Sequence, residues 1–196
     1  MASARRREVI VMGGSAGAVD ALATILPSLP ADFSLPIATV VHLPPDRVSD
    51  LAGALSYRSA VRIKEAEDKE PLTPGCVFVA PPNYHLLLER SGHLSLAVDD
   101  PVHFSRPSID VLFESAALAY GPRVLGILLT GANEDGASGL LAIHRAGGQT
   151  LVQSPESAVA SAMPSSALLL EPRHDVLPLE EIGPFLLQLH RTGWEA

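Results

Sequence analysis

Ser15 stands in a sequence context that could support nucleophilic chemistry. The stretch 13–17 reads GGSAG and follows an apolar run at 9–12, so it fits the Gly-x-Ser-x-Gly pattern of a nucleophile elbow between a strand and a helix. The first N–H groups of the following helix could stabilise an oxyanion. Residues 13–18 lack the spacing of a dinucleotide-binding glycine loop and the lysine of a P-loop. This motif alone leaves a nucleophile and a plain or anion-binding turn equally open.

A nucleophilic serine needs a base and an acid, and two other polar residues also follow apolar runs. His42 comes directly after the run at 37–41, and imidazole titrates near neutral pH, as a general base should. Asp135 follows the run at 124–129 and could fix the histidine tautomer and stabilise the imidazolium. Taken singly, His42 could be an ordinary loop histidine and Asp135 the N-cap of the next helix. Glu134 competes with Asp135 for the role of the acid.

The elements that must position these residues alternate between strand and helix. The pattern predicts strands at 8–12, 37–41, 61–63, 76–80, 124–129 and 150–152, and helices at 19–26, around 51–55, 109–120, 136–146 and 182–190. Segments 84–89 and 93–98 flank a turn at Gly92 and predict a hairpin. The predicted fold class is α/β, with a largely parallel, doubly wound sheet, helices on both faces and one antiparallel β-hairpin. Ligands bind such sheets at the carboxyl edge of the strands, where all three candidates should lie.

Composition limits the other classes of function. The 196 residues suit a single domain, 1–196, of which we expect 1–7 to be frayed. The net charge of -8 argues against a nucleic-acid partner. No apolar run approaches the ~20 residues of a membrane helix, so no membrane insertion is expected. The arginines at 5–7 precede an apolar stretch broken by Gly13 and Gly14, which excludes a secretion signal and predicts a cytoplasmic protein.

The remaining titratable residues carry no metal or cofactor signature. The lone Cys76 is predicted to be a small buried strand residue, since one thiol makes neither an intrachain disulfide nor a zinc site. The histidines outside the candidate site show no metal-ligand spacing, so we expect no metal and no cofactor, and we interpret them as structural or exposed: His85, His93, His103, His144 and His190.

The chain order of the candidates leaves a second enzymatic interpretation open. The order here is Ser, His, Asp, whereas α/β-hydrolases have Ser, Asp, His. An esterase of that type, acting on small esters, would need a late histidine, and His174 is available. It is not preceded by a clear strand, which places this alternative second.

Several blocks of the sequence, taken together, resemble the catalytic domain of the bacterial protein-glutamate methylesterases of chemotaxis. The resemblance extends from about Val9 to about Leu189. The blocks occur in the family's order and are GSAG at 14–17, VHLPP at 41–45, APP at 80–82 with His85 and Leu86, RPSIDVLF at 106–113, LLTG at 128–131, DGA at 135–137 with Gly139, and SAV at 157–159 with Met163 and Pro164.

The resemblance implies a specific reaction. Ser15, His42 and Asp135 match the family's triad, which hydrolyses glutamate γ-methyl esters on chemoreceptor signalling helices and also deamidates receptor glutamines. The oxyanion donors would be the backbone N–H groups of Ala16 and Ala132. The chain departs from the family at Ala132 and Asn133, where a Met-Gly pair is common, so the resemblance does not carry over the geometry of the oxyanion hole. A lost donor would lower the rate by about 10²–10³.

The resemblance also raises the question of regulation. Many family members carry an N-terminal receiver domain that restrains the esterase, whereas here about seven residues precede the first predicted strand. We therefore expect a stand-alone esterase that is not switched by phosphorylation in cis. The alternative from another class of function is a catalytically silent adaptor. Such a protein would bind receptors, or would bind an anionic ligand on the Ser15 loop. Arg106 is a candidate for receptor docking by its position in a family block, or else a surface arginine that binds nearby carbonyls.

Overall fold

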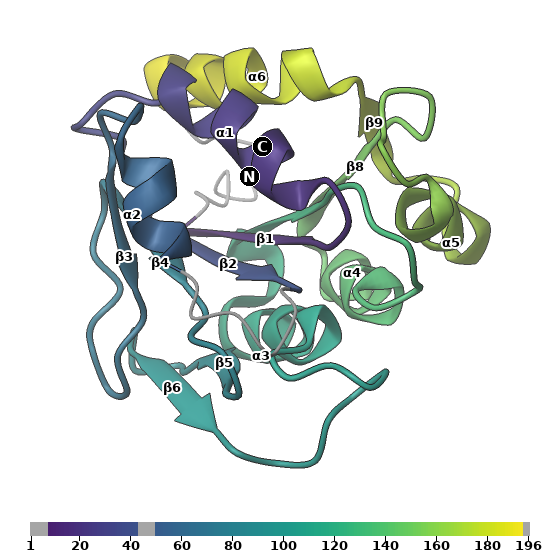
Figure 1. Ribbon diagram of the computed structural model, residues 1–196, viewed down its shortest axis with the longest axis horizontal. Coiled ribbons are helices and arrows are strands. Elements are labelled where there is room, and N and C mark those ends of the chain that lie inside the picture. Colours follow the sequence, from purple (N-terminus) through teal and green to yellow (C-terminus); the bar gives the residue numbers. More distant parts are fainter. Residues whose placement is uncertain (1–7, 43–49, 194–196) are drawn as a thin grey trace, which may run out of the picture.

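The computed structural model describes residues 8–42 and 50–193, and its centre is a parallel sheet (Figure 1). The strand order is β3-β4-β2-β1-β7-β8-β9, and every neighbouring pair is parallel. The strands are β1 (Val9–Gly14), β2 (Ile37–Val41), β3 (Arg62–Glu65), β4 (Cys76–Val79), β7 (Val124–Leu128), β8 (Gln149–Gln153) and β9 (Asp175–Leu177). The predicted α/β class with a largely parallel sheet is confirmed. The expectation for residues 1–7 lies outside the described residues.

Helices cover both faces of this sheet. They are α1 (Ala18–Ile25), α2 (Leu51–Ser56), α3 (Ile109–Tyr120), α4 (Ala137–Arg145), α5 (Ala162–Leu170) and α6 (Leu179–Thr192), with short 3₁₀ turns at Leu26–Ser28 and Gly121–Arg123. One core contains residues of α1, α2 and α6, and the other contains residues of α3, α4 and α5. In Figure 1, α1 and α6 lie on one side of the sheet and α3 and α4 on the other. The doubly wound arrangement is therefore confirmed.

The central strands are apolar along their whole length because both faces are covered. All six residues of β1 are buried, with Ile10 and Met12 in one core and Val9 and Val11 in the other. Side chains alternate between the faces of a strand, so each run supplies both cores at once. Cys76 is a buried free thiol in β4, as the sequence predicts.

The predicted hairpin is also present, and it packs against α3 rather than joining the sheet. Strands β5 (His85–Leu88) and β6 (Leu94–Ala97) pair antiparallel and form a two-stranded sheet of their own. Gly92, in the turn, has a φ of 81°, a left-handed conformation that glycine adopts without strain. Leu86 and Leu94 belong to the core beneath α3, so the hairpin extends that core beyond the main sheet.

Two elements are absent from the sequence-based prediction. Helix α5 contains Pro164 in its first turn. Proline is tolerated there because the amides of the first turn make no intrahelical hydrogen bond. Strand β9 has only three residues, lies at the edge of the sheet and is largely exposed. Neither has the periodicity or the apolar run on which the prediction depends.

Candidate active site

Ser15 and His42 follow two hydrogen-bonded neighbouring strands at the same level. β1 pairs with β2 so that Gly14 lies opposite Val41, and each candidate is the next residue along its strand. The His42 amide continues the ladder by donating to the Gly14 carbonyl at 3.1 Å. Adjacent strands are about 4.8 Å apart, so both side chains start from the same part of the carboxyl edge. The Ser15 amide donates to the Thr130 carbonyl after β7 at 2.9 Å, which brings a third strand end to the site.

The imidazole of His42 binds Asp135. Nε2 lies 2.8 Å from Oδ2, and the two side chains are 11% and 0% exposed. A carboxylate only accepts, so Nε2 must carry the proton in this hydrogen bond. In neutral imidazole the lone pair is then on Nδ1, which is the nitrogen left to act as a base. No hydrogen bond joins Ser15 Oγ to His42 within the described part of the chain.

Asp135 is fixed by the amino end of helix α3. Oδ1 accepts from the Ser108 hydroxyl at 2.9 Å and from the Asp110 amide at 3.0 Å. Oδ2 accepts from the Ile109 amide at 2.8 Å, as well as from His42. These amides are first-turn donors without intrahelical partners, and the positive end of the helix dipole favours an anion. Burial alone raises the pKa of Asp135, but the hydrogen bonds from His42 and the Asp110 and Ile109 amides outweigh it, so the pKa is lowered. Asp135 is therefore an ionised acceptor.

Asp110 in turn accepts hydrogen bonds from the amino end of helix α4. Its Oδ1 accepts from the amides of Gly136 and Gly139, at 3.0 and 2.6 Å, at the start of α4. Burial, and to a lesser extent the charge of Asp135, raise the pKa of Asp110 despite these bonds. Two aspartates thus cap each other's helices: Asp135 precedes α4 and caps α3, while Asp110 begins α3 and caps α4. This pairing fixes Asp135 relative to both helices.

Gly13 allows helix α3 to approach β1 closely enough for this contact. A Cβ built on Gly13 would lie 2.2 Å from Ile109 Cγ2, and Ile109 is the residue whose amide binds Asp135. We predict that Gly13→Ala destabilises the protein by about 1–3 kcal/mol through overpacking and lowers esterase activity by shifting α3 away from Asp135. Urea denaturation and steady-state kinetics of the variant measure the two effects.

A second-site variant serves as the control for Gly13→Ala. Ile109→Ala removes the γ-carbons that the new methyl group meets. The double variant Gly13→Ala/Ile109→Ala should lose less free energy of unfolding than the two single variants lose in sum, since residues in contact are coupled. Strictly additive losses would show that the Gly13–Ile109 contact does not set the position of the helix.

The two candidate oxyanion donors are the backbone N–H groups of Ala16, next to Ser15 in the chain, and of Ala132, two residues after the Thr130 carbonyl that binds the Ser15 amide. Both residues are exposed, and neither amide donates a hydrogen bond to another described residue. Thr130, two residues before Ala132, connects this loop to two others. Its hydroxyl donates to the Ala16 carbonyl at 2.9 Å and accepts from the Ala160 amide at the same distance. Asn133, in the departure from the family pattern, accepts from the Asp135 amide at 3.3 Å. Its side chain therefore shapes the turn that leads to Asp135.

Glu134 and His174 are not placed to act with Ser15. The Glu134 side chain is 70% exposed and lies 3.7 Å from His103 rather than beside His42. His174 precedes β9, and its Nδ1 shares a 2.7 Å hydrogen bond with Thr150 near the start of β8. Thr150 aligns through Gly126 with Val11, four residues before Ser15, or about 13 Å back along the strand direction. The alternative in which His174 is the base is therefore wrong.

One group of side chains in the described ranges could offer ligands to a metal ion. Atoms of His103, Asp110 and Asp135 lie within 4.8 Å of one another. Each oxygen of Asp135 already accepts two hydrogen bonds, and His103 Nε2 lies 3.2 Å from Asp110 Oδ2. The hydrogen bonds to Asp135 and the close contact of His103 with Asp110 therefore explain why these three side chains lie together. His103, which the sequence placed among the structural or exposed histidines, thus contacts the aspartate pair.

In the sequence, Ser108 looks like the N-cap of the helix at 109–120 and Asp110 like an acid of its first turn, and the sequence assigns neither of them a role at the site. The Ser108 hydroxyl does accept from the Val111 amide, at 3.5 Å, as an N-cap should. Its second role, as a donor to Asp135, depends on where α4 begins in space. The signal available was RPSIDVLF itself, a polar block that starts a helix and to which no chemistry had been assigned.

The fold and the site together define an α/β protein with a serine and a histidine–aspartate pair at one edge of its parallel sheet. The CheB methylesterase family model matches residues 10–186. The catalytic domain of Thermotoga maritima CheB methylesterase superimposes with a TM-score of 0.88 and 33% identity, over 93% of this chain and 98% of that one. The chain therefore belongs to the CheB methylesterase family.

Curated relatives of two different lengths match this chain. A putative protein-glutamate methylesterase/protein-glutamine glutaminase of Leptospira interrogans is 44% identical over 188 residues, which cover 96% of this chain and 97% of the relative. The protein-glutamate methylesterase FrzG of Myxococcus xanthus is 39% identical over 180 residues, 92% of this chain and 54% of FrzG. These names describe hydrolases of carboxylic esters. None of the helices in the described ranges has the length and apolar character needed to cross a bilayer.

Proposed function

We propose that this protein is a cytoplasmic serine hydrolase that removes methyl groups from glutamate γ-methyl esters on chemoreceptor signalling helices, and that it also deamidates receptor glutamines. The observation that carries the proposal is the His42–Asp135 pair, which stands beside Ser15 in strand register within a chain of the CheB methylesterase family. The names of the curated relatives support the substrate class. No cofactor is needed for this chemistry.

The mechanism follows from the hydrogen bonds around His42. Asp135 holds the Nε2–H tautomer, so Nδ1 takes the Ser15 proton while Oγ attacks the ester carbonyl. The amides of Ala16 and Ala132 stabilise the oxyanion of the tetrahedral intermediate. His42 returns the proton to the departing methoxide, which leaves as methanol. Water then attacks the acyl-enzyme, with His42 again as base, and releases the glutamate carboxylate. With a glutamine substrate the same steps release ammonia.

The surroundings of the site suit a side chain carried by a protein. Ser15 is partly exposed, and two apolar side chains near the site face solvent: Phe104, which is fully exposed, and Val159. A Cβ on Gly17 would lie 2.7 Å from Val159 Cβ, so Val159 stands directly beside the Ser15 turn. Phe104 lines a pocket together with His42. Exposed apolar groups at the edge of a site favour contact with another protein surface.

Methanol release from methylated chemoreceptor membranes tests the proposal. We expect the wild type to release methanol and His42→Ala to lose about 10³-fold or more of the activity, since its general base is gone. The matched histidine variant His174→Gln retains activity, because position 174 lies far from the carboxyl edge. Loss of activity in His174→Gln but not in His42→Ala would overturn the assignment of the base. Cleavage of a generic ester without methanol release would keep the hydrolase and reject the receptor substrate.

A further inference from the structure

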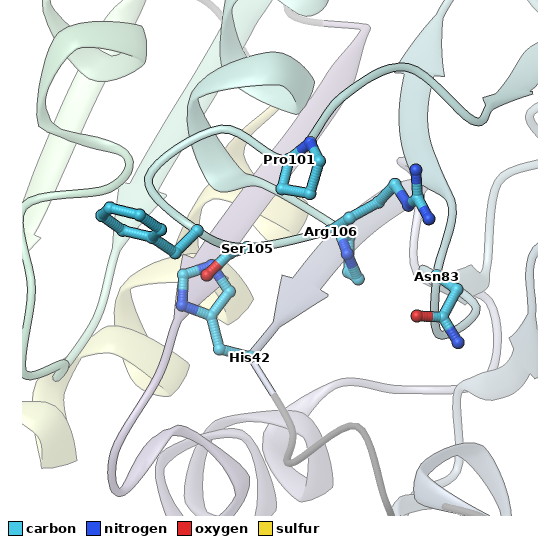
Figure 2. Close-up of a pocket in the computed structure, with 7 residues that line it drawn as sticks. His42, Asn83, Pro101, Ser105 and Arg106 are labelled. Atoms are coloured by element: carbon cyan, nitrogen blue, oxygen red, sulfur yellow. The ribbon is translucent and has the colours of Figure 1, made fainter.

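A pocket lies beside His42, and the proposed chemical steps make no use of it. Its volume is about 300 Å³, and it is lined by residues of three segments: His42, Asn83, Pro101, Phe104, Ser105, Arg106 and Pro107. Figure 2 shows His42 at one end of the group and the side chains of Arg106 and Asn83 toward the other. Any group bound in the pocket would lie next to the histidine of the candidate active site.

Arg106 brings a positive charge to this pocket, and no carboxylate among the described residues pairs with it. Its Nη1 donates to the carbonyls of Val98 and Asp99, at 2.9 and 3.0 Å, so the interpretation as an arginine that binds nearby carbonyls is correct for that nitrogen. Its Nε is buried and has no hydrogen-bond partner among the described residues. No described acidic group forms an ion pair with it. A partly buried cation without an anionic partner is costly, and an anion bound in the pocket beside the guanidinium would lower that cost.

Asn83 adds a second uncommitted donor. Its backbone adopts a left-handed φ of 64°, which asparagine tolerates better than most residues. The residue is exposed, and its carboxamide makes no hydrogen bond to another described residue. The amide and the guanidinium both line the pocket, so they can bind one small acceptor together.

The wall that carries Arg106 is held in place at several points. Residues 102 and 105 exchange two backbone hydrogen bonds across a tight turn, at 3.1 and 2.8 Å, although His103 and Phe104 between them have φ values of 49° and 60°. His85 binds both ends of the segment, since one ring nitrogen lies 3.2 Å from the Asp100 carbonyl and the other accepts from the Ser108 amide at 3.1 Å. Non-glycine residues held in the left-handed backbone region by such contacts are typical of functional sites.

We propose that this pocket is a second substrate subsite, which binds the carboxylate of an Asp or Glu side chain near the ester being hydrolysed. The inference rests on the proposed function, because it concerns the same protein substrate. The guanidinium fork and the carboxamide are donors that match a carboxylate. The chain carries a net charge of -8 and so repels acidic partners in general. A single local cation therefore favours substrates with a carboxylate at one particular position, and not substrates that are acidic overall. A methylated neighbouring glutamate would lose this contact, and the subsite would therefore order successive demethylations.

Matched peptide substrates test the subsite. Each helical peptide carries one glutamyl γ-methyl ester, and the pairs differ only in Asp or Asn one helical turn before or after it. We expect the wild type to have a KM about tenfold lower for the Asp peptide at one of these positions, as for one charge-assisted hydrogen bond. Arg106→Gln should bring the Asp/Asn ratio of KM close to one, with kcat changing less than KM. Arg106→Lys should keep part of the ratio.

Two further variants separate the subsite from a loss of structure. Arg90→Gln is the matched arginine control. Arg90 lies in the hairpin turn, donates to the Leu118 carbonyl of α3 and does not line this pocket, so the variant should keep the wild-type ratio. Asn83→Ala breaks no hydrogen bond between described side chains and should lower the ratio even if Arg106→Gln fails to fold. A wild-type ratio of one, or an unchanged ratio in Arg106→Gln and Asn83→Ala, overturns the subsite while methanol release upholds the esterase. Failure of the wild type to hydrolyse either peptide overturns the subsite, and failure also to release methanol from methylated receptor membranes overturns both proposals.

Discussion

Ser15→Ala is expected to lower ester hydrolysis by about 10³–10⁶-fold and to abolish labelling by a serine-directed fluorophosphonate. The reason is chemical, because alanine has no oxygen for His42 to deprotonate and no acyl-enzyme can form. The fold should be unaffected: the Ser15 hydroxyl makes no hydrogen bond to another described side chain, and the backbone bond to Thr130 does not depend on the side chain. The free energy of unfolding should stay within about 0.5 kcal/mol of the wild type. Rates, mass-spectrometric labelling and urea denaturation measure the three effects.

Ser105→Ala is the matched control for that experiment. Ser105 lines the pocket beside His42 (Figure 2), but unlike Ser15 it lies on a loop rather than at the end of a strand. Labelling of Ser15 should persist in this variant. A label that remains in Ser15→Ala and disappears in Ser105→Ala would show that Ser105, and not Ser15, is the nucleophile. Absence of labelling in the wild type, with intact receptor binding, would favour the silent adaptor.

The positions of Ser15 and His42 could be predicted because the central strands leave an unambiguous pattern. β1, β2 and β7 are buried on both faces and appear as continuous apolar runs, each ended by a polar or small residue. In a parallel sheet the ends of such runs must share an edge. Strand register then decides whether two candidates are neighbours, and the pairing of Gly14 with Val41 places Ser15 next to His42.

The sequence could not reveal how Asp135 is fixed. Its acceptor contacts depend on the amino ends of α3 and α4 meeting in space, and the two helices are separated by β7 in the chain. Asp110 looks like an ordinary first-turn acid, although it caps the other helix. The tautomer of His42 and the unpaired Nε of Arg106 likewise depend on three-dimensional contacts that no local pattern encodes.

The position of a residue along the strand direction, relative to the carboxyl edge, also cannot be predicted without the strand register. His174 was an acceptable base by chain order, but it precedes a three-residue edge strand that the sequence did not predict. Once β9 is aligned with β8, His174 falls beside Thr150, well back from the carboxyl edge. Burial and the neighbouring His144 lower the pKa of His174, which fits a neutral structural histidine.

Asp135→Asn should damage both catalysis and stability. A carboxamide can accept at only one side, whereas Oδ1 and Oδ2 each accept from a backbone amide, Asp110 and Ile109 respectively. Either orientation therefore sets an NH₂ group against a helix N–H, and we expect a loss of about 2–4 kcal/mol in the free energy of unfolding. If the NH₂ also faces His42, Nε2 must accept and the proton moves to Nδ1, which can then no longer deprotonate Ser15. That tautomer change should lower kcat by about 10⁴-fold.

The dependence on pH distinguishes this ionic role from simple packing. The pKa of Asp135 in the folded protein lies below its unfolded value of about 3.9, so its carboxylate stabilises the fold above that pH. This stabilisation is lost as the pH falls through the folded pKa, and the stability gap between wild type and Asp135→Asn should narrow below about pH 4. Glu134→Gln is the matched control, because the exposed neighbour should change neither kcat nor unfolding measurably. A gap that stays constant with pH would mean that residue 135 acts through its shape, and its charge would then have no part in holding the His42 tautomer.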